Sequence, residues 1–540
     1  MNIKQKTIDL IDALKATCQT YGMGNDGNEY KIITQVFLYK FLNDKFGHEI
    51  KEKSVKIAKA AKWEEEYESM SNEERLDLFD KLSPDIPRLY PEHLISFLWN
   101  QQSKGEFDLI FDSTMIDIAE KNIDIFSTMT DEKTRIPLFE KLTVFVTDEA
   151  KRAPFARALV DKLANFSFEE AFSEHYDFFA TIFEYLIKDY NTAGGGKYAE
   201  YYTPHSIATI MARLLVGETD NLHDIEVYDP SAGTGTLLMA LAHKVGEDKC
   251  TIYSQDISQR SNKMLKLNLI LNNLVSSLDH AIQGDTLVSP FHKNDDGTEL
   301  KQFDFVVSNP PFNMDFSDTR DIIAAKTTRF WAGVPNIPKK KLDGMPIYTC
   351  FIQHVVNSLK KTGKAAIVVP TGFLSSKSGV EGTVLSKLVE EKIVYGCISM
   401  PSNVFANTGT NVSVLFLDGS KSSTDVMLID ASKLGEEYKE GKNQKRRLRD
   451  FEINQIVDSF INKVSNDGFS INVSLDKVKE KKNSLSAGMY FKVKTDNPTI
   501  STSKYNEIVC DYITALDEYK LNADNFVEWA KDSLLKKNDK

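Results

Sequence analysis

The pattern of apolar and polar positions changes twice along the chain. In the first part, Ile33, Phe37 and Phe41 recur every four residues without helix breakers, which predicts a buried amphipathic helix. Stretches of this kind predict an all-helical N-terminal domain over residues 1–165.

In the central part, residues 166–430, short runs rich in β-branched residues alternate with helical patterns. Such alternation predicts an α/β fold in which helices cover a mostly parallel, doubly wound sheet. The expected strands are residues 225–228, 251–253, 303–307, 365–369 and 393–398. Glycine marks the same division, with 5 in residues 1–193, 18 in residues 194–419 and 4 in residues 420–540. We therefore predict that the central part is the catalytic domain.

The last part, residues 431–540, is more polar and is predicted to hold a basic linker and a helical tail. The basic run comprises Lys442, Lys445, Arg446, Arg447 and Arg449. The tail carries an apolar stripe at helical spacing, formed by Tyr505, Ile508, Val509, Tyr512, Ile513 and Leu516. Such a stripe needs a partner, either the core of this chain or another subunit, so we expect this region to serve in subunit assembly.

Net charge limits how the chain can contact nucleic acid. Its 540 residues carry 66 Lys and Arg against 78 Asp and Glu, a formal net charge of −12. Any nucleic acid must therefore be held by a local basic surface or by a partner. Residues 339–341 and 442–449 offer such a surface, although both runs also fit solvated loops.

Cysteine spacing and hydropathy indicate the compartment. The five cysteines show neither zinc-ligand spacing nor a disulfide framework, so no metal site is expected and a reducing cytoplasm fits best. No apolar run approaches the roughly 18 residues of a membrane span, and the charged start MNIKQKTIDLIDALK differs from a signal peptide. We therefore predict a cytoplasmic protein with no membrane partner.

A turn of small residues follows the first expected strand of the central part. It runs from Asp229 to Gly235 with the sequence DPSAGTG, and an apolar helix start follows. This arrangement lets the backbone approach a ligand closely and points N–H groups at a negative group, which suits a nucleotide-like ligand. A short Gly-x-Gly turn also occurs in many purely structural connections. The candidate contacts are Asp229, Ser231, Gly233, Thr234 and Gly235.

Two further acids end the next strands. Asp256 follows Asp229 by 27 residues, at a strand end where its carboxylate can bind both hydroxyls of a ribose. Asp285 follows a third strand and can accept a hydrogen bond from an adenine amino group. Either acid alone could cap a helix. Acids at three successive strand ends favour a ligand site.

The sequence Asn309-Pro310-Pro311-Phe312 is the sharpest signal for catalysis. The prolines fix the backbone and remove N–H donors, which leaves the Asn309 amide oxygen and the Pro310 carbonyl as rigid acceptors. Two acceptors side by side suit a planar amino group, because hydrogen bonds to both of its protons expose the nitrogen lone pair. Phe312 adds an aromatic face on which a base can stack. The alternative is a plain Pro-Pro turn after a strand.

The DPSAGTG turn followed by NPPF resembles the amino-methyltransferases that use S-adenosylmethionine. The whole chain is similar to the modification subunit of type I restriction-modification systems, which are N6-adenine DNA methyltransferases. The resemblance implies a Rossmann-like S-adenosylmethionine-dependent methyltransferase core between an all-α N-terminal domain and a helical C-terminal tail. It assigns the turn to the methionine part of the cofactor, Asp256 to its ribose and Asp285 to its adenine, and it makes NPPF the catalytic tetrapeptide. One departure is that many relatives carry Glu where this chain has Asp256.

Two more segments resemble this family. Ala199–Pro204 is similar to the family's segment that closes over the methionine end of the cofactor. Its candidate cofactor contacts are Tyr202, Thr203 and Pro204. Phe405, in the sequence MPSNVF, is either a second contact to the target base or a core aromatic.

The predicted function is therefore transfer of a methyl group from S-adenosylmethionine to adenine N6 in DNA, without a metal. Little sequence is left for a domain that reads bases, so recognition is expected from a separate specificity subunit. The resemblance also allows a second modification subunit and a restriction helicase-nuclease subunit. Open alternatives are a methyltransferase for cytosine N4, RNA or a protein glutamine amide, and a cofactor-binding scaffold without turnover.

Overall fold

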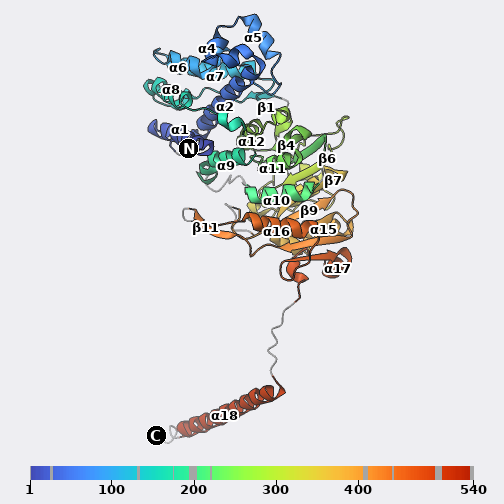
Figure 1. The fold of residues 1–540 in the computed structure, drawn as a ribbon. Coiled ribbons are helices and arrows are strands. Elements are labelled where there is room, and N and C mark those ends of the chain that lie inside the picture. Colours follow the sequence, from blue (N-terminus) through green and yellow to red (C-terminus); the bar gives the residue numbers. More distant parts are fainter. Residues whose placement is uncertain are drawn as a thin grey trace. The chain divides into compact units, whose positions relative to one another are not determined.

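The computed structural model describes residues 2–24, 28–130, 134–173, 176–193, 203–218, 222–405, 411–440, 443–492 and 501–535 (Figure 1). The chain divides into two compact units, Met1–Tyr490 and Phe491–Lys540. The candidate contact Tyr202 lies outside the described residues. No helix within the described ranges combines the length and apolar character needed to cross a bilayer.

An 11-stranded sheet lies at the centre of the larger unit, in the order β13-β10-β8-β9-β7-β6-β3-β4-β5-β1-β2. The strands are β1 (Ser127–Thr130), β2 (Arg135–Pro137), β3 (Ile225–Asp229), β4 (Cys250–Asp256), β5 (Ala281–Gln283), β6 (Phe303–Ser308), β7 (Leu359–Pro370), β8 (Val394–Ser399), β9 (Val412–Asp418), β10 (Asp425–Asp430) and β13 (Ser470–Ser474). Pairing is parallel from β5 through β4, β3 and β6 to β7, and β9 runs antiparallel between β7 and β8. The predicted mostly parallel sheet and all five expected strands are confirmed.

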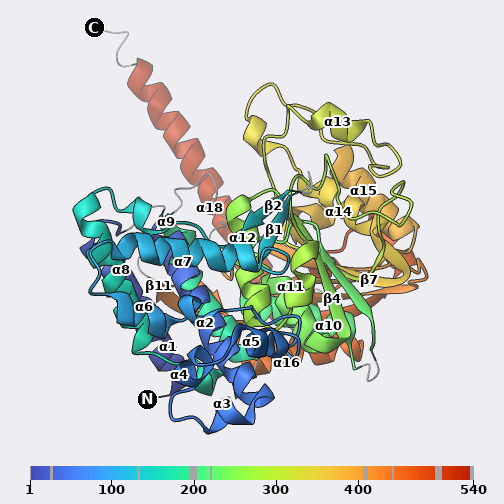
Figure 2. The same cartoon turned by 90° about the horizontal axis from the view of Figure 1, so that it is seen from above.

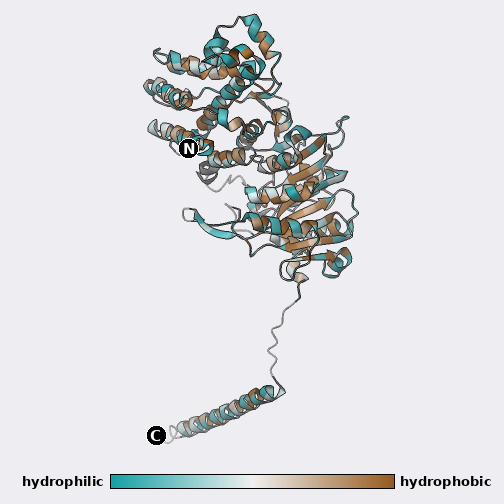
Figure 3. Ribbon diagram, in the orientation of Figure 1, coloured by the Kyte–Doolittle hydropathy of each residue, from teal (hydrophilic) through white to brown (hydrophobic). Residues whose placement is uncertain are grey.

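The central strands are apolar because helices cover both faces of the sheet. Seen from above, α10, α11 and α12 lie along one face, and α14 and α15 lie along the other (Figure 2). The apolar strands therefore lie between two layers of helices, one on each face of the sheet (Figure 3). These helices and the short α13 are α10 (His205–Val216), α11 (Thr236–Val245), α12 (Gln259–Leu271), α13 (Arg320–Ala324), α14 (Tyr348–Asn357) and α15 (Gly379–Glu390).

The N-terminal region is helical, as predicted. Its helices are α1 (Ile3–Thr20), α2 (Glu29–Lys53), α3 (Val55–Lys59), α4 (Trp63–Glu68), α5 (Asn72–Phe79), α6 (Ile95–Gln101), α7 (Phe107–Lys121), α8 (Glu149–Ala164) and α9 (Tyr176–Ala193). The expected helix around Phe37 and Phe41 is α2, and both rings pack edge to face against Phe168, at centroid distances of 5.2 and 5.6 Å. Helix α9 packs on α1 and α2, so the helical region extends past the boundary expected at residue 165.

Two short strands interrupt this helical region, so the prediction of an all-helical domain is wrong at β1 and β2. Strand β1 pairs with β5 in parallel, with Met129 opposite Ile282. The buried Lys266 side chain of α12 donates from Nζ to the carbonyl of Ser127 at 2.7 Å. The strand forms because it covers the otherwise open edge of β5, which no local pattern in the sequence reveals.

The boundary expected at residue 430 is also crossed by the sheet. Strand β13 pairs antiparallel with β10, and α16 (Asp450–Ile461) packs on α10 and β10. Lys445, Arg446 and Arg447 of the basic run lie in β12 (Asn443–Arg447), which pairs antiparallel with β11 (Glu436–Glu440), and α17 (Leu475–Glu480) follows β13. Residues 431–490 thus belong to the larger unit rather than to a linker, because α16 buries apolar side chains such as Phe460, whose ring lies 4.8 Å from that of Phe416.

The smaller unit contains the predicted helical tail, α18 (Thr502–Leu535). Most of the apolar stripe is exposed along this helix, including Tyr505, Tyr512 and Ile513.

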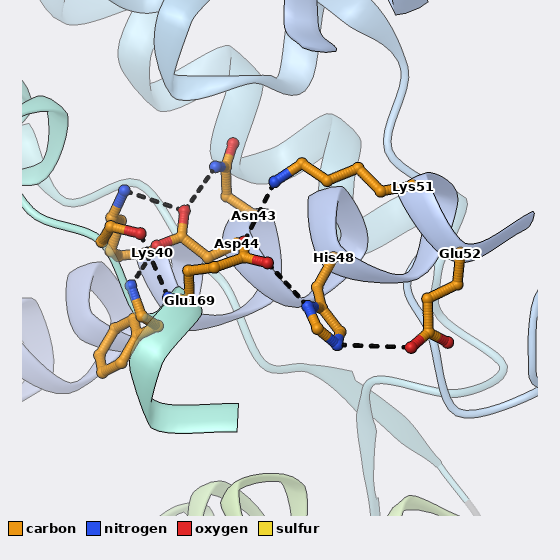
Figure 4. A network of polar contacts seen from close by, with 9 residues as sticks. Lys40, Asn43, Asp44, His48, Lys51, Glu52 and Glu169 are labelled. Carbon is orange, nitrogen blue, oxygen red and sulfur yellow. Dashed lines mark hydrogen bonds and ion pairs between the residues drawn. The ribbon is translucent and has the colours of Figure 1, made fainter. Parts of the chain in front are cut away.

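A network of polar side chains joins α2 to the segment after α8 (Figure 4). Lys40 Nζ lies 2.9 Å from Asp44 Oδ1, and the two side chains are 6% and 9% exposed. Asp44 also accepts hydrogen bonds from Asn43 Nδ2 at 3.0 Å and from the Phe168 backbone N–H at 2.8 Å. This network holds the segment around Phe168 onto α2.

Candidate active site

Hydrogen bonds join the carboxyl ends of three neighbouring strands. The N–H of Gly233, after β3, donates to Asp256 Oδ2, at the end of β4, at 2.8 Å. The N–H of Gly284, after β5, donates to the Asp256 carbonyl at 2.9 Å. The Thr286 hydroxyl closes the set by donating to the Pro230 carbonyl at 2.7 Å. The structure therefore brings the three predicted strand ends together.

The turn after β3 needs its glycines. Gly233 and Gly235 have φ angles of +53° and +84°, in the left-handed region that favours glycine. A Cβ at Gly235 would approach Leu265 Cδ1 to 2.2 Å, whereas a Cβ at Gly233 would meet no atom within 4 Å. Gly235 caps α11, so the predicted helix after the turn is confirmed. The backbone at Gly233 can therefore be approached closely by a ligand.

Asp229, the last residue of β3, is only 1% exposed. Burial raises the pKa of its carboxyl to about 8, although a hydrogen bond from the Ser231 backbone N–H (2.9 Å) opposes the rise; the charge of Asp256 adds to it. A positive group placed beside this carboxyl would favour the ionised form.

Asp256 and Asp285 both also cap turns. Asp256 Oδ1 accepts from the Ser258 N–H at 2.8 Å. Asp285 Oδ1 accepts from the N–H groups of Leu287 and Val288, at 2.9 and 3.1 Å. A carboxylate has about four lone-pair sites, so Asp285 keeps acceptor capacity for a ligand. The ribose contact of Asp256 and the adenine contact of Asp285 stay predictions.

Asn309, directly after β6, lies beside the turn. Its Nδ2 donates to Thr203 Oγ1 at 3.0 Å. Among the described residues, its Oδ1 has no hydrogen-bond partner. The shared pocket is lined by Thr203, Asp229, Ser231, Ala232, Thr234, Thr236, Leu237 and Asn309. The predicted catalytic amide and the predicted cofactor turn therefore face one space.

The two candidate aromatic contacts are both buried, with 6% exposure each. Phe312 packs edge-on against Tyr348 of α14, with ring centroids 6.2 Å apart. Phe405 directly precedes residues 406–410, which lie outside the described residues. Stacking on a base stays a prediction for Phe312, and both alternatives stay open for Phe405.

Sequence reasoning missed two side chains that support the site. Ser308 Oγ lies 2.7 Å from Ser231 Oγ and so connects β6 to the glycine turn. The buried Arg329 donates from Nη1 to the Thr286 carbonyl at 3.3 Å and so supports the loop after β5. The signal for Ser308 was a hydroxyl at the end of an otherwise apolar strand, whereas Arg329 lies in a long connection without periodicity.

One group of possible metal ligands occurs within the described part of the chain, formed by Glu92, His93 and Asp117. The His93 ring accepts the Tyr90 N–H at Nδ1 (3.1 Å) and therefore carries its proton on Nε2, which donates to Asp117 at 2.5 Å. The ring has no lone pair left for an ion, and burial lowers its pKa. This group stabilises the helical region.

The sheet order, the glycine turn after β3 and the tetrapeptide after β6 define a Rossmann-like S-adenosylmethionine-dependent methyltransferase core. The chain belongs to the N-6 DNA methylase family, whose model matches residues 174–498.

The chain is similar to two methylase subunits. The type I restriction enzyme MpnII methylase subunit of Mycoplasma pneumoniae is 28% identical over 368 residues, 66% of this chain and 65% of that protein. The MjaIX methylase subunit of Methanocaldococcus jannaschii is 26% identical over 360 residues, 63% of this chain and 60% of that protein. The chain thus spans less than two thirds of the length of these relatives.

A solved structure confirms the fold. The methyltransferase subunit of a type I restriction-modification system from Streptococcus thermophilus superposes with a TM-score of 0.74 at 21% identity, covering 91% of this chain and 100% of that chain.

Proposed function

We propose that this chain transfers the methyl group of S-adenosylmethionine to adenine N6 in DNA, as the modification subunit of a type I restriction-modification system. The observation that carries the proposal is that Asn309 lines the same pocket as Asp229 and Ser231 of the glycine turn. Methyl donor and accepting nitrogen can therefore meet at the carboxyl edge of the sheet. Membership of the N-6 DNA methylase family supports adenine N6 as the acceptor.

Asn309 and Pro310 hold the accepting amine. Because the Asn309 amide nitrogen already donates to Thr203, its oxygen is the atom available to the substrate. The Asn309 Oδ1 and the Pro310 carbonyl accept the two N6 protons, which draws the nitrogen towards tetrahedral geometry and directs its lone pair at the methyl group. Adenine reaches this position only when flipped out of the duplex, and Phe312 is assigned to stack on it.

The residues around the pocket fit S-adenosylmethionine. When bound, it supplies a methyl group on a positively charged sulfonium, and direct transfer needs no metal. Gly233 leaves room for close approach, and a positive charge beside the buried Asp229 would favour the ionised form of this carboxyl. The proposed contacts are Tyr202, Thr203, Pro204, Asp229, Ser231, Gly233, Thr234 and Gly235 for the methionine part, Asp256 for the ribose and Asp285 for the adenine.

A separate specificity subunit reads the DNA sequence in this proposal. The formal charge of −12 leaves DNA binding to local basic surfaces or a partner. The relatives above are named as subunits of type I restriction enzymes. The tail supplies an assembly surface. Four exposed aromatic residues recur every seven positions along it, as in a coiled-coil seam: Tyr505, Tyr512, Tyr519 and Phe526.

A second modification subunit and a restriction helicase-nuclease subunit complete the proposed assembly. We place this assembly in the cytoplasm, where the five free cysteine thiols of this chain would stay reduced.

The test uses tritiated S-adenosylmethionine and the full-length chain, alone and co-expressed with the specificity subunit of its own genome. The chain alone should bind the cofactor and label DNA weakly, and the complex should produce N6-methyladenine, identified by mass spectrometry of nucleosides. Label in cytosine, RNA or glutamine would show that the substrate is not adenine in DNA. Cofactor binding without transfer of label to any substrate would indicate a scaffold.

A deletion tests the assembly. Removing residues 500–540 should leave cofactor binding intact and abolish co-purification with the specificity subunit. Sequence-specific methylation by the isolated full-length chain would overturn the proposed division of labour.

A further inference from the structure

One hydrogen bond crosses the pocket between two distant parts of the chain. Asn309 Nδ2 and Thr203 Oγ1 are 3.0 Å apart, in residues separated by 106 positions. Both residues are buried, with 7% and 5% of their surface exposed. In this environment the bond has few solvent molecules to compete with it.

Thr203 is held by a helix. It precedes Pro204, the N-cap residue of α10, whose carbonyl accepts the N–H groups of Ile207 and Ala208 at 3.0 and 3.1 Å. Helix α10 packs on α11 and β7. The hydroxyl of Thr203 is therefore presented from an element anchored on the sheet.

The backbone of Asn309 is equally well held. It continues β6, which pairs with β3 and β7, and the preceding Ser308 contacts Ser231. The side-chain amide is different, because rotation about its last torsion exchanges the oxygen and the nitrogen at little intrinsic cost. Backbone placement therefore does not decide which of these two atoms faces the substrate.

The proposed reaction requires the oxygen. An amide nitrogen turned towards the substrate would oppose its own protons to those of the adenine amine, and neither group could accept. With the nitrogen bonded to Thr203, the oxygen is left on the other side of the amide of this pocket-lining residue.

We propose that Thr203 is a positioning residue that holds the Asn309 amide with Oδ1 towards the amine being methylated. This inference rests on the proposed function and extends it, since it gives Thr203 a role in turnover besides contact with the cofactor. A residue that only binds cofactor changes the dissociation constant of S-adenosylmethionine. A residue that orients Asn309 changes kcat at saturating cofactor.

The experiment compares variants of the full-length chain in complex with its specificity subunit. Thr203→Val keeps the side-chain shape and replaces the hydroxyl with a methyl group. Thr203→Ala also removes the hydroxyl, but it places no new methyl group beside the polar neighbours. Both should lower kcat about tenfold, the effect of one lost hydrogen bond. The dissociation constant of S-adenosylmethionine, measured by calorimetry, separates the two roles, because a lost cofactor contact raises this constant whereas lost positioning lowers kcat at saturating cofactor. Thr203→Ser, which keeps the hydroxyl, should return kcat to within about threefold of the unaltered chain.

Thr7→Val is the matched control, because Thr7 is a buried threonine of α1 whose hydroxyl donates to the Ile3 carbonyl at 2.8 Å, away from the pocket. It should leave kcat unchanged, and melting curves establish that each variant is folded.

Unchanged kcat in Thr203→Val and Thr203→Ala would overturn the inference, as would a change confined to cofactor affinity, or a Thr203→Ser variant as slow as Thr203→Ala. In each of these cases N6-methyladenine from the unaltered complex would leave the proposed function standing. Absence of that product from the unaltered complex would refute the proposed function itself, and this inference with it.

Discussion

Two buried asparagines show how differently the helical region and the sheet edge use the same side chain. In α2, Asn43 donates to Asp44 and accepts the Ile95 N–H at 3.1 Å, so both ends of its amide are used. At the sheet edge, Asn309 donates to Thr203, and its oxygen has no partner among the described residues. An amide bonded within the protein at both its oxygen and its nitrogen stabilises the fold, whereas an oxygen left without a partner in a pocket can serve a ligand.

The carboxylates differ in the same way. Asp44 is paired with Lys40 inside the helical region. Asp229 forms no ion pair within the described residues, and burial raises its pKa to about 8. Such an uncompensated acid is costly to the fold, and the cost is consistent with a binding role.

The largest expected difference between the two regions is between substitutions of Asn309 and of Asn43. Asn309→Ala should abolish methyl transfer, at a cost of at least ~3 kcal/mol in transition-state stabilisation, because one strong acceptor is lost. Affinity for S-adenosylmethionine should hardly change. Asn43→Ala is the control: it should lower the melting temperature and keep kcat. A tritium assay and calorimetry measure both variants, and substantial activity in Asn309→Ala would refute its assignment.

The buried ion pair should matter for stability alone. Lys40→Met leaves the buried Asp44 without its cation and should lower the free energy of unfolding by about 3 kcal/mol. Lys51→Met removes a partly exposed pair with Glu169 from the same network and should cost at most about 1 kcal/mol. Urea unfolding separates the two, and equal losses would contradict the distinction between the buried pair and the partly exposed one.

Asp256 should matter for the cofactor. Asp256→Ala should weaken binding of S-adenosylmethionine by about 1.5–3 kcal/mol, the range for charge-assisted hydrogen bonds, with much less effect on turnover at saturating cofactor. Asp256→Glu keeps the charge and should bind more tightly than Asp256→Ala. Wild-type affinity in Asp256→Ala would mean that the ribose is held elsewhere.

The smallest expected effect concerns Asp229 and pH. Because burial raises its folded-state pKa to about 8, above the ~3.9 of an unfolded Asp, the unfolded state loses its proton first. The stability of the wild-type chain therefore falls as pH rises through this window. Asp229→Asn removes that loss and should melt about 2–5 °C higher at pH 8, with the gap closing towards pH 4. Differential scanning calorimetry across this range would show no such gap if Asp229 were already ionised.

The sequence by itself determined the central strands, the glycine turn and the tetrapeptide. Each depends on neighbouring residues: β-branched runs favour strands, positive φ at Gly233 and Gly235 requires glycine, and the prolines after Asn309 constrain the backbone locally. The region 1–165 was likewise recognisable as largely helical from periodicity.

Only the tertiary structure decided how distant segments meet. Strands β1 (STMT) and β13 (SINVS) extend the sheet at or near its two edges, and runs of four and five residues are too short to predict which strand each one pairs with. The bond from Asn309 to Thr203 joins residues 106 positions apart, and the contact between Ser231 and Ser308 spans 77. Such contacts depend on the packing of whole elements, so they leave no periodic signal in the sequence.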